Sequence, residues 1–214
     1  MGMIERGGLD ALSLHKLAAE VDYTPGALYR YFGSKGSLLS TLLRVILDDL
    51  RRHLEVGVAG LPEGTSPLAR VFALVLAYRV FARREPQRFG LLAMSMAEPR
   101  VLVQESEDAA SLVETMTSVM KALSDALASS AASGALEEGD AGERTLCLFA
   151  LVQGVLQLHK QSRYAPALLD LDRLVVRGVG ALLVGWGARL ESVEQAIAQV
   201  GSSGGKPSAK GEQP

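Results

Sequence analysis

Helical periodicity runs through almost the whole chain and constrains its fold more than any other feature. Apolar residues recur three and four positions apart, and no run alternates between apolar and polar residues as a half-buried strand does. Segments rich in Gly or Pro separate the periodic stretches at 61–67, 84–86, 97–100, 132–142 and 164–166. The pattern therefore predicts an all-α protein.

The composition indicates a globular protein. Of its 214 residues, 48% are hydrophobic and 21% are charged, and the net charge is −2. The most apolar stretch is interrupted by Arg177 and is shorter than the roughly 20 residues that a membrane span needs. A single cysteine, Cys147, excludes an internal disulfide. We expect a cytoplasmic protein without a membrane partner, in which any nucleic-acid site is local.

Residues 13–32 carry the pattern of two short helices joined by a tight turn. Ser13 can cap the first helix, and Thr24 and Pro25 suit the start of the second. The apolar face of the first helix would be formed by Leu14, Leu17, Ala18 and Val21. This order of elements predicts a helix-turn-helix.

The second of these helices has an outward surface that suits a DNA groove. At about 100° per residue, Leu28 and Phe32 share the buried side and Arg30 lies almost opposite them. The outward surface and its flanks are formed by Gly26, Ala27, Tyr29, Arg30 and Tyr31. Small residues let the backbone approach base edges, Arg30 could reach a guanine, and the tyrosines could donate to phosphates. Lys35, in the first turn of the next helix, is placed for another phosphate contact.

The charge pattern supports DNA binding only locally. Residues 23–47 contain three bases, Arg30, Lys35 and Arg44, and no acid, but residues 1–60 contain seven bases and seven acids. Non-specific phosphate affinity should therefore be modest and strongly salt-dependent. A solvated surface helix with two chance tyrosines is the alternative.

A resemblance to the TetR family of bacterial transcriptional regulators lies in residues 8–39, GLDALSLHKLAAEVDYTPGALYRYFGSKGSLL. The matching positions are Gly8, Leu14, Leu17, Ala18, Gly26, Leu28, Tyr29, Tyr31, Phe32, Lys35, Leu38 and Leu39. The resemblance implies phosphate contacts from Thr24, Tyr29 and Lys35. It also implies that the groove residues are Gly26, Ala27, Arg30 and Tyr31, with Pro25 opening the same helix.

Two features depart from the family's pattern. Only residues 3–6 precede Gly7 and Gly8, so most of the first helix, which usually packs behind the reading helix, is expected to be absent. A start codon further upstream would explain this. Gly36 stands where the family often carries an acid. A helical dimer that binds a ligand or a protein partner, with lost or weak DNA binding, is therefore the alternative function.

We expect three parts along the chain. Residues 1–56 would form the helix-turn-helix DNA-binding domain, its first helix truncated, together with a connecting helix that begins near Lys35. Residues 57–200 would form a larger helical domain for effector binding and dimerisation. Residues 201–214 contain no large apolar side chain and would be a disordered tail.

Adaptable apolar side chains are concentrated between residues 67 and 127. The resemblance implies a site here for a small apolar or amphipathic effector. The candidates are Phe72, Tyr78, Phe89, Met94, Met96, Met116 and Met120. For each of them, a place in the ordinary core is the alternative.

Two further helices are expected at 143–164 and 167–190, and both carry small residues among bulky apolar ones. A glycine inside a helix costs about 1 kcal/mol relative to alanine, which favours a role in close helix packing. The resemblance implies that these helices pair with their copies in a four-helix homodimer interface. The candidates are Ala150, Gly154, Gly178, Gly180, Gly185 and Trp186. Packing within one chain is the alternative.

No pattern supports catalysis, a metal or a cofactor. His15, His53 and His159 lie far apart and have no ligand partner three or four positions on, and Cys147 is expected to be a buried small side chain. Residues 178–187 lack the spacing of a dinucleotide-binding fingerprint. We therefore expect a regulator without enzymatic activity, more a repressor than an activator, that binds a palindromic double-stranded DNA operator.

Overall fold

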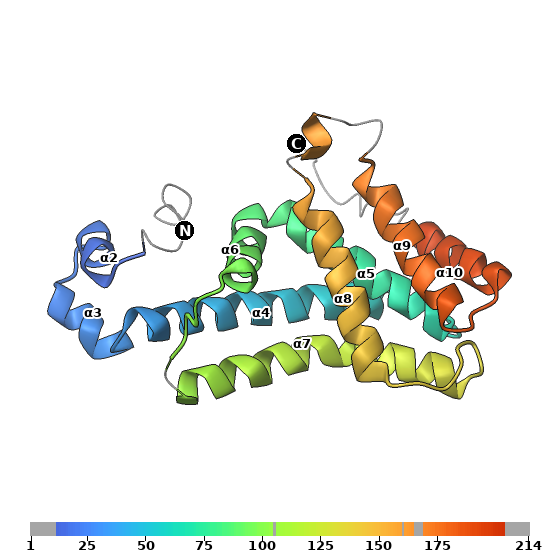
Figure 1. Cartoon of the computed structure of the whole chain (residues 1–214), viewed down its shortest axis with the longest axis horizontal. Helices are drawn as coiled ribbons and strands as arrows, with labels where there is room; N and C mark the ends of the chain where they lie inside the picture. Colours follow the sequence, from blue (N-terminus) through green and yellow to red (C-terminus); the bar gives the residue numbers. More distant parts are fainter. Residues whose placement is uncertain (1–11, 105, 160, 165–168, 204–214) are drawn as a thin grey trace, which may run out of the picture. The chain divides into compact units, whose positions relative to one another are not determined.

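The computed structural model describes residues 12–104, 106–159, 161–164 and 169–203. These residues form nine α-helices, a short 3-10 helix and no strand, which confirms the all-α prediction (Figure 1). Residues 1–11, where a truncated first helix was expected, and residues 204–214 of the expected tail lie outside the described residues.

Most helix boundaries fall at or near the Gly- and Pro-rich segments of the sequence. They are α2 (Leu14–Glu20), α3 (Pro25–Phe32), α4 (Lys35–Ala59), α5 (Pro67–Arg84), α6 (Pro86–Ala97), α7 (Ser106–Ala132), α8 (Ala141–Gln157), the 3-10 helix η2 (Gln161–Arg163), α9 (Leu171–Gly185) and α10 (Leu190–Ser203). Three of them begin at a proline, which suits a first turn because the missing N–H would have no partner there.

The C-terminal helices differ from the expected ranges. α8 ends at Gln157 instead of near residue 164, and α9 ends at Gly185 instead of residue 190. Just beyond α9, Gly187 has a φ of 95°, a conformation that glycine adopts without strain and that stops the helix. A further helix, α10, then runs to Ser203, so the first three residues of the expected tail are helical.

The chain divides into two compact units. The first comprises the described parts of residues 1–53 and 80–120, and the second those of residues 54–79 and 121–214. The divisions fall inside α4, α5 and α7, so each of these helices contributes residues to both units. The functional division expected at residue 57 stays a prediction.

In the described part of the first unit, α4 supplies more buried apolar side chains than any other helix. They are Leu38, Leu39, Leu43, Ile46, Leu47 and Leu50, spaced as one helix face. Two hydrogen bonds join this helix to α7: the Ser40 hydroxyl donates to the Asp108 carbonyl at 3.2 Å, and Arg44 Nη1 donates to Ser111 Oγ at 2.8 Å.

In the second unit, α5 is buried nearly all the way round. Five consecutive residues, 71–75, are all buried. α4 and α5 come very close here: a Cβ added to Gly57 would lie 2.6 Å from the Ala77 Cβ, so only glycine fits. α9 packs against both α8 and α10 (Figure 1). Among the described helices, none has the length and hydropathy to cross a membrane.

Candidate functional site

α2 and α3 pack together across a short turn and form a helix-turn-helix. The turn closes where the Tyr23 N–H donates to the Ala18 carbonyl at 3.0 Å. Asp22, in the middle of the turn, has a φ of 55°, which side chains other than glycine, asparagine and aspartate rarely adopt. The direction of α3 therefore depends on one residue in a left-handed conformation.

The capping residues predicted for α3 take the expected roles. Thr24 Oγ1 accepts a hydrogen bond from the Ala27 N–H at 3.2 Å, and Pro25 is the first residue of the helix. Ser13 precedes α2 at the N-cap position, but its side chain makes no capping hydrogen bond. The C-terminal end of α3 is set by Gly33, whose φ is 65°.

Fewer residues of the helix-turn-helix are buried than its apolar pattern predicts. Leu14, Ala18 and Leu28 are buried, whereas Leu17 and Phe32 are half-buried. Val21 is 45% exposed, so the predicted apolar face of α2 ends one turn early.

The outward side of α3 presents most of the residues predicted to bind DNA. Arg30 is exposed between Tyr29 and Tyr31, which are 52% and 70% exposed. A Cβ on Gly26 would meet nothing within 4 Å, so the backbone of the first turn is open to a close approach. Thr24 and Lys35 are exposed at the two ends of α3, while Pro25 and Ala27 are half-buried. The surface combines phenolic donors, one guanidinium and open backbone, as groove readers do.

Tyr23 adds an aromatic hydroxyl that the sequence pattern did not predict as a DNA contact. It lies in the turn directly before Thr24 and is 58% exposed. An aromatic residue between two polar turn residues, Asp22 and Thr24, was the available signal. Tyr23 adds a third exposed phenol, directly before the N-terminal end of α3.

Arg44 does not belong to this surface. Its guanidinium is half-buried in the first unit and donates to Ser111, so it is engaged within the fold. Of the three bases counted between residues 23 and 47, only Arg30 and Lys35 are exposed. The exposed acids Glu20 and Asp22 lie close in sequence, so the helix-turn-helix carries little net positive charge.

The seven effector candidates are distributed over both units. Phe72 and Tyr78 belong to the second unit and are buried. The others belong to the first unit: Phe89 is buried, Met94 and Met120 are half-buried, and Met96 and Met116 are exposed by 45% and 41%.

Tyr78 makes a buried polar contact that the sequence did not predict. Its hydroxyl donates to Oε1 of Gln153 on α8, and its ring centroid lies 6.1 Å from that of Phe149. Burial raises the pKa of Tyr78, so this hydroxyl keeps its proton. A lone glutamine inside the apolar run LFALVQGVL was the available signal for Gln153.

The dimer candidates divide between packing inside the chain and an open surface. A Cβ on Gly178 would lie 3.0 Å from the Leu151 side chain, and one on Gly180 would lie 3.4 Å from Val193. These two glycines therefore bring α9 close to α8 and α10. Trp186 is half-buried, with the Arg144 guanidinium carbon 5.4 Å from its ring centroid.

Two of the remaining candidates lie on an exposed stripe of α8. Ala150 and Gly154 are exposed here, in line with Leu146, which is 62% exposed, and with Cys147. The expectation that Cys147 is buried was wrong, because it lies on the side of α8 away from Leu148 and Val152 of the core. On α9, Gly185 is exposed and Val184 is 42% exposed. Both helices thus present small and apolar side chains to solvent.

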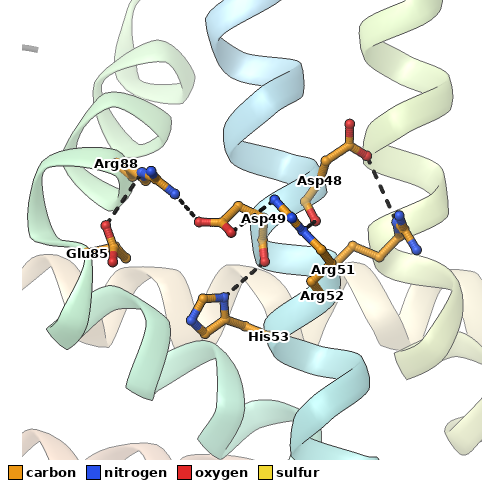
Figure 2. Close-up of polar contacts among 7 residues, drawn as sticks. All are labelled: Asp48, Asp49, Arg51, Arg52, His53, Glu85 and Arg88. Atoms are coloured by element: carbon orange, nitrogen blue, oxygen red, sulfur yellow. Dashed lines mark hydrogen bonds and ion pairs between the residues drawn. The ribbon is translucent and has the colours of Figure 1, made fainter.

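A network of charged residues joins α4 to α6 in the first unit (Figure 2). The Asp49 carboxylate forms ion pairs with Arg88 of α6 and with Arg52 of its own helix. Nε of Arg88 also lies 3.4 Å from Oε2 of Glu85. Nδ1 of His53 lies 3.0 Å from the Asp49 carbonyl. Asp49 therefore joins α4 to α6 through an ion pair.

No three His, Cys, Asp or Glu side chains come together to hold a metal ion within the described ranges.

Two family models match the chain. Residues 71–182 match the model described as "Tetracyclin repressor-like, C-terminal domain". Residues 1–42 match the model described as "Bacterial regulatory proteins, tetR family". No curated protein matches the sequence.

Several solved structures share the fold. A protein of unknown function from Rhodococcus sp. RHA1 is 26% identical, with a TM-score of 0.65 over 86% of this chain and 90% of that one. The TetR family regulator PfmR from Thermus thermophilus is 17% identical, with a TM-score of 0.57 over 73% and 81%. AibR, solved in complex with isovaleryl coenzyme A and operator DNA, is 16% identical, with a TM-score of 0.62 over 83% and 90%.

Proposed function

Because the chain belongs to the TetR family of bacterial regulatory proteins, we propose that it is a ligand-responsive repressor that binds a palindromic operator as a homodimer. The observation that carries the proposal is the outward side of α3, where Arg30 and two tyrosines are exposed beside an open Gly26. Charged and phenolic donors around an unobstructed backbone suit the edge of a DNA groove.

Each polar side chain on this surface has a proposed role. Arg30 reads a guanine in the major groove, because a guanidinium can donate to both acceptors of that base. Tyr29, Tyr31 and Lys35 contact the flanking phosphates, with Thr24 at the N-terminal end of α3. Tyr23 joins them, since it is exposed in the turn directly before Thr24. Phosphate contacts position the helix, and Arg30 supplies the sequence preference.

The homodimer is proposed to form through the exposed stripe of α8 and its neighbour α9. Ala150 and Gly154 are small, exposed and aligned with Leu146, so the helix of a second copy could come close to them. A two-fold dimer places one copy of α3 on each half-site, with the half-sites one helical turn or a multiple apart. The pseudo-palindrome in the operator would follow from that symmetry.

The effector is proposed to be a small apolar or amphipathic molecule. It shifts the dimer toward a geometry that fits the operator poorly, and the size of the shift equals its differential affinity for the two geometries. AibR, a protein of the same fold, was solved with both isovaleryl coenzyme A and operator DNA, which supports a double role for the fold.

α4 is the proposed route from effector to DNA. It begins shortly after α3 ends, and the Asp49 network holds it to α6 (Figure 2). A rigid helix of 25 residues that begins beside α3 would transmit a small displacement to the reading surface.

One observation favours a second function, a helical dimer that binds a ligand or a protein partner and has weak DNA binding. Arg44 is engaged inside the fold, and Glu20 and Asp22 are exposed beside the reading helix. Fewer free bases mean fewer released counterions, and therefore a lower affinity for any DNA.

A selection from random DNA duplexes, with the full chain at near-physiological salt, tests the proposal. Enrichment of a palindrome supports the repressor, and its loss in the Arg30→Ala variant would assign the reading to α3. Lys121→Ala, which removes an exposed base on α7, is the matched control and should enrich the same sequence. A folded dimer that enriches nothing would refute the repressor and favour the second function.

A further inference from the structure

Three buried side-chain nitrogens have no hydrogen-bond partner in the part of the chain that the structure describes. Two are Nε atoms of arginines whose guanidinium groups are held elsewhere: Arg44 by Ser111, and Arg79 by Asp172 at 2.9 Å. The third is Nε2 of Gln153, which is 6% exposed. Each arginine has other guanidinium nitrogens that make a hydrogen bond or an ion pair, whereas the Gln153 side chain has only this one nitrogen.

An unpartnered buried amide nitrogen needs a physical reason. It has lost its hydrogen bonds to water and has gained none in return, so it destabilises the fold unless something else accepts from it. Buried polar groups in folded proteins are nearly always paired with protein, water or ligand. Gln153 is therefore a position where a bound molecule is expected.

Tyr78 determines which end of the amide is free. Its hydroxyl donates to Oε1, which leaves the NH₂ group as the unpartnered end. Burial raises the pKa of Tyr78, so the hydroxyl keeps the proton that it donates to Oε1. The site thus offers N–H donors and requires an acceptor.

The surroundings of this amide are apolar. Phe149, one turn earlier on α8, lies beside the Tyr78 ring and is half-buried. Val152 and Leu156, the neighbours of Gln153 on the same helix, are buried. A charged carboxylate would lose its hydration here, whereas an uncharged carbonyl would lose little.

We propose that the Gln153 amide binds an uncharged carbonyl oxygen of an otherwise apolar effector, with Tyr78 as the residue that orients the amide. The inference rests on the proposed effector site and names the chemical class of its ligand. A hydrogen-bonded carbonyl fixes the orientation of an apolar molecule that would otherwise have only shape to recognise it.

The test uses two pairs of probes matched in size: acetone with acetate, and 2-octanone with octanoate. The ¹⁵N–¹H signals of the Gln153 side-chain NH₂ are followed in the full chain at neutral pH, and are assigned by their absence in the Gln153→Leu variant. The ketones are expected to shift both signals and the carboxylates are not. Shifts by the carboxylates alone, or by none of the probes, would overturn the proposal.

The variants separate a ligand from a trapped water. Gln153→Leu should weaken ketone binding about tenfold, the worth of one hydrogen bond, when binding is followed on the backbone amides of α8. Tyr78→Phe should weaken it less, because the amide remains but is no longer held. Gln195→Leu makes the same change on the exposed side of α10 and should leave binding unchanged. Equal ketone affinity in Gln153→Leu and the unmodified chain would refute the role of the amide.

This experiment contains no DNA, so its outcome is independent of the proposed repressor. A ketone that binds at Gln153 in a chain that enriches no operator would leave the ligand class standing and refute the regulator. If the chain enriches an operator but its Gln153 signals do not move, the regulator stands and the proposed ligand class is refuted.

Discussion

Asp22 and Gly33 occupy left-handed backbone positions at the two ends of the segment that carries α3. Gly33 adopts a φ of 65° without strain, but Asp22, at 55°, adopts it against the preference of its Cβ. The aspartate also places a negative charge beside the proposed phosphate contacts. The backbone of Asp22 therefore favours DNA binding, because it forms the turn that directs α3. Its carboxylate opposes DNA binding, because it repels the phosphates.

Replacement of Asp22 separates these two effects. Asp22→Asn should raise DNA affinity without loss of stability, because asparagine tolerates the left-handed region and carries no charge. Asp22→Ala removes the same charge but should lower stability by about 1 kcal/mol, the cost of alanine at positive φ. Thermal unfolding and binding to the selected operator check both variants. Equal melting temperatures would show that Asp22 is not held in this conformation.

Arg30 and Lys35 should differ in what their loss does to DNA recognition. Arg30→Ala should cost about 1–3 kcal/mol at one base-pair position and relax specificity there. Lys35→Ala should weaken binding to all sequences about equally and reduce the salt slope, since a phosphate contact carries no sequence information. Titrations of matched and mismatched duplexes at several salt concentrations separate the two patterns. Uniform weakening by Arg30→Ala would mean that α3 is oriented differently in the groove.

Among the elements, α4 combines the most functions. Its first turn holds Lys35, its middle holds Asp49, and its end packs tightly on α5 at Gly57. Each contact uses a different interaction: charge with the proposed DNA, an ion pair with α6, and close steric contact with α5. The helix can be tested at two of these places without any DNA.

The approach of α4 to α5 should make Gly57 irreplaceable. In Gly57→Ala the added Cβ would lie 2.6 Å from that of Ala77, and the helices would have to separate. Overpacking typically costs about 1–3 kcal/mol, which exceeds the gain in helix propensity. Gly90→Ala, in α6 with nothing within 4 Å, should instead stabilise by up to about 1 kcal/mol. Urea unfolding measures both, and a gain in both variants would contradict the close contact.

The ion pair between Asp49 and Arg88 should couple α4 to α6 measurably. A double-mutant cycle with alanine should give a coupling of about 0.5–1 kcal/mol, because Asp49 is only 16% exposed and little screened. The pair Lys121 and Asp125 on α7, exposed by 70% and 63%, is the control and should give about 0.3–0.5 kcal/mol. A coupling at Asp49 that vanishes in moderate salt would place the pair at the surface.

For the whole molecule, the decisive feature is the exposed stripe of α8. Leu146, Cys147, Ala150 and Gly154 are exposed along one side of that helix. A palindromic operator requires two copies of α3 at a defined separation, and a monomer cannot supply this. The proposed repressor therefore depends on what covers the stripe.

A charge in the middle of the stripe should separate the copies. Ala150→Glu would bury two carboxylates in a two-fold interface and should raise the dimer Kd by at least about tenfold. Ala128→Glu, at an exposed position of α7, is the matched control. Sedimentation velocity gives the oligomeric state and circular dichroism the helix content. A dimer that survives Ala150→Glu would place the interface elsewhere.

The sequence alone determined the local structure of this protein. Helical spacing, Pro25 and Thr24 as helix starters and the glycine-rich breaks were enough to predict an all-α fold and a helix-turn-helix. These features are local because each depends on hydrogen bonds and backbone angles within a few residues. The range of α8, however, was predicted too long, because no Gly or Pro marks the end of the helix between Gln157 and residue 165.

Only the tertiary structure decided which side of each helix is covered. Arg44 is engaged by Ser111, Cys147 is exposed, and Gln153 is buried beside Tyr78, although all three lie in apolar helical runs. Periodicity shows which residues share a face, but the helix that packs on that face comes from a distant part of the chain. The buried unpartnered amide, on which the ligand class depends, exists only because of that packing.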